Sequence, residues 1–187
     1  MNTTTPIRFR ARLFATLLLL AAHPLAAQGV AAARANEKED SARAEAAAKQ
    51  LAKTGNVAGA EKVLTDRSKF KAGSTEWHRD AAQNVAKLAD DLAREGQRTA
   101  VSALAASALQ HLASADSPAL SKPRRAALKV SAARVHEELR GDYAAAIAGY
   151  ADAVSLDPTD RVAQEAHERL KAADDKLRGR IQAKRKS

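Results

Sequence analysis

Cysteine is absent from the chain, which can therefore form neither a disulfide nor a lipid-modified cysteine. Aromatic residues are scarce at 3%, and after residue 27 only Phe70, Trp77, Tyr143 and Tyr150 are aromatic. They do not form a series interleaved with basic residues, as a base-stacking surface requires, so we expect no nucleic acid as a partner. No segment shows the alternating β-branched pattern of a strand. These absences predict an all-α protein that is held together by helix packing.

Catalytic and metal-binding patterns are also missing. The His-Glu pairs at His136 and His167 begin like the zinc motif H-E-x-x-H, but a basic residue stands four positions after each histidine. His78 and His111 have no histidine, cysteine or carboxylate at ligand spacing on the same helix face. The sequence contains no glycine-rich phosphate loop. We therefore expect no catalytic residue, no cofactor and no metal ion, and a protein that is not an enzyme.

Alanine supplies 47 of the 187 residues and more than half of the apolar ones. Because alanine is the best helix former and the smallest core residue, this composition predicts closely approaching helices with thin packing layers. Two apolar stripes at helical spacing are expected to pack against each other: Trp77, Ala81, Val85, Leu88 and Leu92; and Val101, Leu104, Ala105, Ala108 and Leu112. Trp77 is interpreted as a core anchor, the alternative being an exposed partner contact.

The first 27 residues have the pattern of a secretory signal peptide. Three arginines at positions 8, 10 and 12 precede an apolar run over residues 13–22, and His23-Pro24 and Leu25-Ala-Ala-Gln28 follow as the cleavage region. A run of ten residues is too short to span a bilayer, which needs about 20 apolar residues. The alternative is a retained anchor, because Leu25 is not the small residue preferred three positions before a cut. We expect an exported protein, periplasmic or extracellular, that begins near Gln28 and has no membrane span after processing.

The segment from Gly141 to Asp160 resembles the second helix of a tetratricopeptide repeat. Gly141 and Asp142 form a turn, in which the glycine ends one helix and the aspartate caps the next. The small, aromatic and proline positions of the repeat are matched by Ala146, Tyr150, Ala153 and Pro158, and Tyr143 falls on the same helix face. The preceding helix fits the family less well, with Val130, Ala133, Arg134 and Glu137 where Trp, Leu, Gly and Tyr are usual. Residues 127–160 form one degenerate repeat.

Two further glycines suggest earlier hairpins. Gly55 and Gly96 each stand between two helical patterns as Gly141 does, at intervals of 41 residues (55 to 96) and 45 residues (96 to 141). These intervals exceed the repeat length of about 34 residues. The excess falls in the predicted loops 67–74 and 114–123, which are rich in polar residues and proline.

The resemblance implies antiparallel αα-hairpins that stack as a short tetratricopeptide-like solenoid with a C-terminal capping helix. The capping stripe is expected to cover Tyr150 and consists of Val162, Ala166, Leu170, Ala173, Leu177 and Ile181. The predicted organisation is a signal peptide (1–27), a flexible linker (28–35), the helical domain (36–183) and a basic tail (184–187).

Positive charge is concentrated at the C-terminus. The chain carries a formal net charge of +9, of which the signal arginines supply +3 and residues 171–187 supply +5. One interpretation is that Lys184, Arg185 and Lys186 contact an anionic polymer or lipid. The other is a solvated helix end whose cations complement the negative pole of the helix dipole.

Two hypotheses for function follow from these patterns. The resemblance implies a scaffold or adaptor of the bacterial cell envelope, which holds a protein partner in the groove formed by the first helices of stacked hairpins. The alternative is a structural or surface-associated protein that attaches to an anionic envelope polymer or membrane through its basic tail. Only attachment through the tail should weaken steeply as salt screens the charges.

Overall fold

The structure is a computed structural model that describes residues 37–186, with the main chain alone for the last two of these. The chain divides into two compact units, residues 1–43 and 44–187. In the first unit the described residues, 37–43, are helical. The predicted signal peptide (1–27) and linker (28–35) lie outside the described residues. Among the helices that are described, none combines the length and the apolar character that crossing a bilayer requires.

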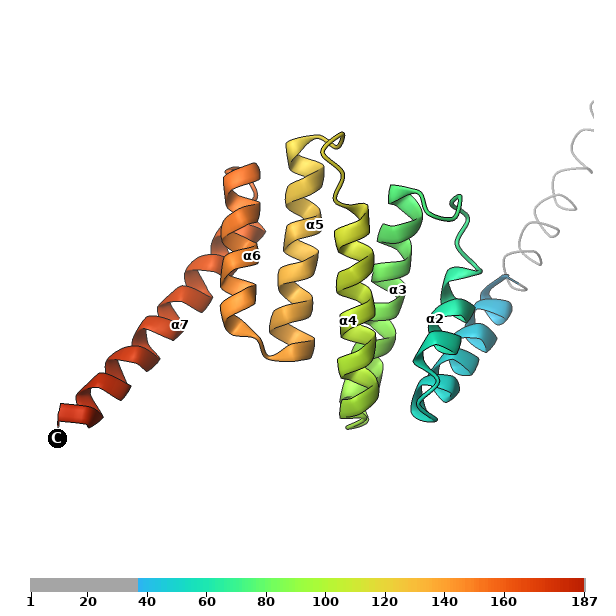
Figure 1. The fold of residues 1–187 in the computed structure, drawn as a ribbon, viewed down its shortest axis with the longest axis horizontal. Coiled ribbons are helices and arrows are strands. Elements are labelled where there is room, and N and C mark those ends of the chain that lie inside the picture. The colour runs from blue at the N-terminus through green and yellow to red at the C-terminus, as the bar shows by residue number, and fades with distance from the viewer. Residues whose placement is uncertain (1–36, 187) are drawn as a thin grey trace, which may run out of the picture. The chain divides into compact units, whose positions relative to one another are not determined.

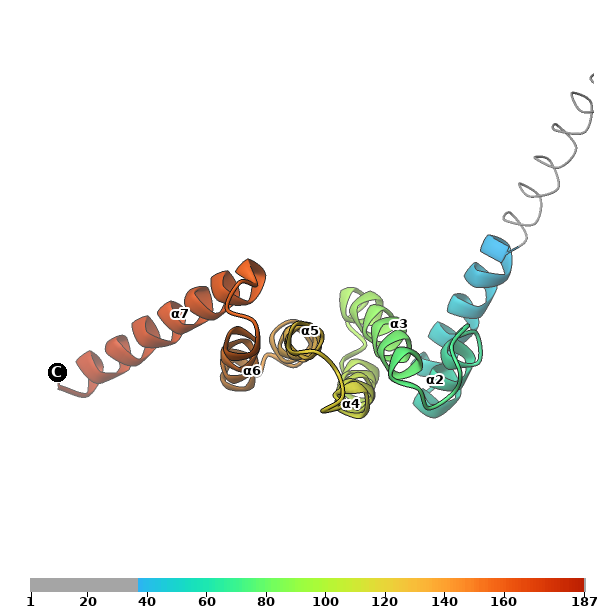
Figure 2. The same cartoon turned by 90° about the horizontal axis from the view of Figure 1, so that it is seen from above.

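The second unit contains only helices and connections in its described part, which confirms the all-α prediction. Residues 44–53 are helical, and the helices that follow are α2 (Val57–Thr65), α3 (Thr75–Arg94), α4 (Arg98–Ala115), α5 (Lys122–Arg134), the π-helical turn η1 (Val135–Arg140), α6 (Tyr143–Leu156) and α7 (Arg161–Lys186). Helices that are consecutive in the sequence pack against each other (Figure 1). Figure 2 shows α3 and α5 along one side of this unit and α2, α4 and α6 along the other.

The three predicted glycine turns are present. Gly55, Gly96 and Gly141 adopt positive φ angles of 85°, 76° and 63°, which a residue with a side chain rarely adopts. Each turn is followed at once by the next helix. Asp142 caps α6 as predicted, because its Oδ1 accepts a hydrogen bond from the backbone N–H of Ala145 at 3.1 Å.

A large core joins residues 44–53 to α2, α3 and α4. The two predicted stripes on α3 and α4 meet there, and Val85, Leu92 and Leu104 are fully buried. Trp77 is the exception, since it is only half-buried and lies at the edge of this core. Most other buried positions are alanines, as the composition predicted.

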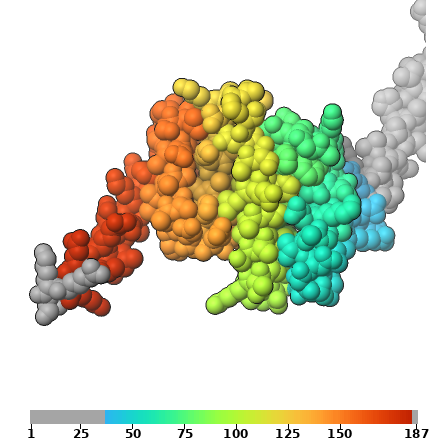
Figure 3. All heavy atoms as spheres, viewed as in Figure 1, coloured from blue at the N-terminus to red at the C-terminus, as the bar shows by residue number. Residues whose placement is uncertain are grey.

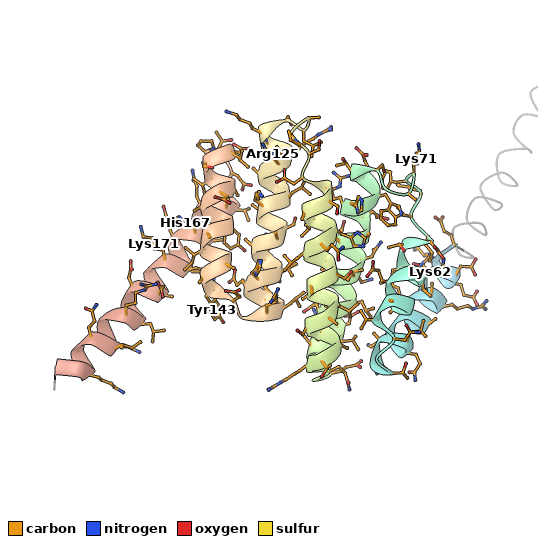
Figure 4. All side chains as sticks on the ribbon, viewed as in Figure 1. Lys62, Lys71, Arg125, Tyr143, His167 and Lys171 are labelled. Carbon is orange, nitrogen blue, oxygen red and sulfur yellow. The ribbon has the colours of Figure 1, made fainter. Side chains whose placement is uncertain are left out.

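A smaller core lies among α5, α6 and α7. Tyr150 is its only large aromatic residue and is 2% exposed, and the residues around it are Ala126, Val130, Ala133, Ala146, Ala153, Ala163, Ala166 and Leu170. Asp116, at the end of α4, connects this region to the large core. Its carboxylate accepts hydrogen bonds from Arg125 Nε at 2.8 Å and from Lys129 Nζ at 3.0 Å, and the two cations lower its pKa. Arg125 is labelled near the start of α5 in Figure 4.

The predicted capping stripe of α7 packs over only part of its length. Ala166 and Leu170 are buried beside Tyr150, but Val162, Leu177 and Ile181 are 49%, 56% and 45% exposed. For Leu177 and Ile181 the reason is length, since α7 has 26 residues whereas its neighbour α6 has 14. The second half of α7 therefore extends beyond the helices that could cover it (Figure 3). The helix also continues through Lys186, so residues 184–186 extend α7 instead of forming a separate tail.

Helices α5 and α6 approach each other closely at Gly149. A Cβ atom added at Gly149 would lie 3.0 Å from the Cβ of Ala133. We expect Gly149→Val to lower the free energy of unfolding by about 1–3 kcal/mol, because it overfills this contact. The control is Gly179→Ala, which meets nothing within 4 Å and should stabilise α7 by up to about 1 kcal/mol. Urea denaturation followed by circular dichroism measures both; equal effects would contradict the close approach.

Candidate functional site

Three hollows lie along the face formed by residues 44–53, α3, α5–η1 and α7, which we call the hollowed face. The central hollow has a volume of about 540 Å³, and those beside it have volumes of about 170 and 330 Å³. We call the hollow of about 170 Å³ the first and that of about 330 Å³ the third. Neighbouring hollows share lining residues. Lys87 lines both the first and the central hollow, and Arg134 and Glu138 line both the central and the third. They therefore form one continuous surface along the first helices of successive hairpins.

Helical spacing explains why these side chains face the central hollow. The lining residues of α3 recur three and four positions apart, and so do those of α5–η1. The central hollow is lined by Arg79, Ala82, Gln83, Ala86, Lys87 and Asp90 from α3, Leu112 from α4, and Ser131, Arg134, Val135, Glu138 and Leu139 from α5–η1. The surface thus combines small and apolar side chains with charged ones, as protein-binding surfaces do.

The charges of the central hollow differ in whether they already have partners. Lys87 is paired with Glu45 at 3.0 Å, and Asp90 is paired with Arg94. Arg79 and Arg134 are exposed, and neither makes a hydrogen bond or ion pair with any described residue. Two guanidinium groups from two different helices are therefore available to an anionic group from outside, for which arginine geometry is well suited.

The third hollow contains a hydrogen-bonded network around Glu137. Tyr150 donates its hydroxyl to Glu137 Oε2 at 3.1 Å, and Arg169 donates to Glu137 Oε1 at 2.7 Å. Burial, together with the hydrogen bond to Glu137, raises the pKa of Tyr150 to about 12. The phenol is therefore neutral at physiological pH and acts as a fixed donor, which joins η1 to α6 while Arg169 joins it to α7.

The residues that carry the tetratricopeptide resemblance fall into two groups. Ala146, Tyr150 and Ala153 are buried together in the smaller core. Gly141 forms the turn before α6, and Pro158 is exposed in the turn after it. Tyr143, expected on the same face as Tyr150, is 57% exposed because it opens α6 directly after the turn, at the end of the hairpin (Figure 4).

The predicted anionic-contact residues lie at the end of α7. Lys184 is exposed, and the helix continues past it through residues 185 and 186. The side chains of Arg185 and Lys186 lie outside the described part of the structure. Lys184 lines none of the three hollows described above.

A histidine cluster joins α2, α3 and α4. His111 Nε2 lies 3.0 Å from Glu61 Oε1, and its Nδ1 lies 3.0 Å from His78 Nδ1. Since Glu61 accepts a hydrogen bond from His111 Nε2–H, Nδ1 of a neutral His111 carries no proton and can accept one. A neutral His78 then donates its Nδ1–H to His111 Nδ1, so that both hydrogen bonds are formed. Trp77 packs edge-on against both rings. Sequence spacing could not predict this cluster, because His78 and Glu61 are 33 and 50 residues away from His111.

These groups do not form a recognisable metal centre or nucleophilic triad. No group of three or more histidine, cysteine or carboxylate side chains with metal-binding geometry occurs in residues 37–186. The remaining oxygen of Glu61 accepts from the hydroxyl of Ser107, so the carboxylate stands between the serine and the histidine. A nucleophilic serine needs the histidine as its direct neighbour. The cluster is therefore a structural link among three helices.

This link should make stability depend on pH. Burial, and to a smaller extent the neighbouring His111, lowers the pKa of His78. His78 therefore binds a proton more readily in the unfolded chain than in the folded one. The free energy of unfolding should fall as pH drops below about 6.5, the unfolded-state pKa of histidine, and should continue to fall until pH passes the lower folded-state pKa. Urea unfolding at pH 7 and pH 5 measures this loss. His78→Gln should remove part of it, and an unchanged pH dependence in that variant would contradict the assignment.

Comparison with models of protein families, with curated proteins and with solved structures gives no significant match for this chain.

Proposed function

We propose that the protein is a non-enzymatic scaffold of the bacterial cell envelope that binds a protein partner along the hollowed face. The hairpins then act as a short tetratricopeptide-like solenoid, whose first helices form the binding surface. Three glycine turns, the buried Tyr150 and continuous hollows on α3, α5–η1 and α7 support this proposal. Export rests on the signal-peptide pattern of residues 1–27.

The observation that carries the proposal is the central hollow, which Arg79 of α3 and Arg134 of α5 both line. Alanines leave space between the helices, and Leu112, Val135 and Leu139 supply apolar contacts. The two guanidinium groups lack partners among the described residues. A segment with apolar residues flanked by carboxylates matches this surface, because apolar contacts give affinity and paired charges fix orientation.

Site-specific photo-crosslinking tests the proposal in cells. A photoreactive amino acid at Gln83, which lines the central hollow, should crosslink to one defined protein. The matched control is the same amino acid at Gln110, which is exposed on α4 and lines none of the three hollows. Equal products from both positions, or none from Gln83, would contradict binding at the hollowed face.

A further inference from the structure

The second half of α7 presents an uncovered amphipathic face. After Leu170, every described side chain of α7 is exposed except Asp174, which is half-buried. Ala173, Leu177 and Ile181 continue the line of Leu170 at helical spacing. The packed stripe of the first half of the helix therefore runs on as an exposed stripe, with Leu177 and Ile181 as its two large residues.

Cations flank this exposed stripe on both sides. At 100° per residue, Lys176 and Arg180 lie along one edge, and Lys171 and Arg178 lie along the other. Figure 4 shows Lys171 where α7 leaves its neighbours. The only acids beyond Leu170 are Asp174 and Asp175, and Asp174 is paired with Arg178 at 2.7 Å. The face therefore combines a narrow apolar stripe with a strong excess of positive charge.

We propose that this face of α7 binds the surface of a bilayer that contains anionic lipid. The helix lies parallel to the membrane, with Leu177 and Ile181 among the acyl chains and the lysines and arginines at the headgroups. Helices that bind in this way have a narrow apolar face bordered by lysine and arginine, whose long stems reach the headgroup level. Anionic headgroups attract each basic residue that lies near them.

The charge and size of the face select lipid over a second copy of the chain. Residues 171–187 carry a net charge of +5, so two such helices repel each other. The stripe offers only two large apolar side chains, which is little for a stable helix pair in water. A purely anionic polymer would pair with the cations but would offer no apolar contact to the exposed stripe. A bilayer surface matches both the charge and the apolar stripe. This surface lies on the second half of α7, whereas the hollowed face that carries the proposed scaffold function uses α7 only up to Arg169.

Vesicle sedimentation tests the proposal with the chain from Gln28 onward. The probes are phosphatidylcholine vesicles with and without phosphatidylglycerol. We expect binding to the anionic vesicles only, and Leu177→Gln with Ile181→Gln should weaken it by about tenfold or more, because the apolar contact is lost at constant charge. Lys176→Gln with Arg180→Gln should also weaken it.

The matched control is Ala172→Gln with Ala183→Gln, which changes exposed positions on the opposite side of α7 and should leave vesicle binding unchanged. Circular dichroism should show that all three double variants keep their helix content. Three results would overturn the proposal: no binding by the unmodified chain, undiminished binding after the Leu177 and Ile181 changes, or a stable dimer that these changes dissociate. The second result would indicate purely electrostatic attachment.

Discussion

Replacing Tyr150 with alanine should lower the free energy of unfolding by about 3 to 5 kcal/mol, the usual cost of deleting a fully buried aromatic side chain. Tyr150 is 2% exposed and is the largest fully buried side chain of the described residues. Most of the side chains around it are alanines, which are too short to fill the space that it would leave. The hydroxyl also donates to Glu137 at 3.1 Å.

Urea denaturation monitored by circular dichroism measures this loss. Tyr150→Phe is the matched control, because it keeps the ring and removes only the hydrogen bond. Glu137 retains its bond to Arg169, so the control should cost only about 1 kcal/mol. If Tyr150→Ala unfolds at the same urea concentration as the unmodified protein, then the smaller core does not depend on this residue and the tetratricopeptide interpretation of α6 is wrong.

Replacing both Arg79 and Arg134 with glutamine should weaken binding of the partner captured at Gln83 by about a hundredfold or more. A hydrogen bond to a charged group contributes about 1.5–3 kcal/mol, and 1.4 kcal/mol corresponds to tenfold in affinity. Neither arginine supports the fold through a hydrogen bond or ion pair with a described residue, so stability should change little. Isothermal titration calorimetry with the purified partner measures the affinity.

The control for this prediction removes the same charge elsewhere. Arg124→Gln with Arg140→Gln changes two exposed arginines that line none of the three hollows. This control should bind the partner nearly as well as the unmodified protein in moderate salt. A similar loss in both double variants would indicate a general dependence on net charge, and the partner would not be held at the central hollow.

Local sequence signals predicted most of the helical framework. Gly55, Gly96 and Gly141 mark the turns because their positive φ angles are unfavourable for other residues, and the stripes on α3 and α4 are visible from spacing alone. Spacing could not predict where the stripe of α7 stops being covered. That boundary depends on the length of α6, which spans only Tyr143–Leu156.

The candidate site was less predictable than the helices, because it depends on tertiary structure. The sequence indicated a groove of first helices, but it could not indicate that Arg79 and Arg134 would face the same hollow from two helices. It also separated His78, His111 and Glu61 by tens of residues, although the fold brings them into hydrogen-bonding distance. Periodicity reports which side of a helix is apolar, whereas pairing between helices is decided by how the hairpins pack.

Helix α5 packs into both cores, so local unfolding of α6 and α7 need not spread to α5. Its Leu128 belongs to the large core, whereas Ala126, Val130 and Ala133 belong to the smaller one. Detachment of α6 and α7 therefore leaves α5 anchored on its other side, so amide protons of α6 and α7 should exchange with solvent at a lower free-energy cost than those of α3 and α4. Such opening removes the third hollow and preserves the central one. A partner that spans both hollows must hold α7 closed, so its affinity and the exchange protection of α7 are thermodynamically linked.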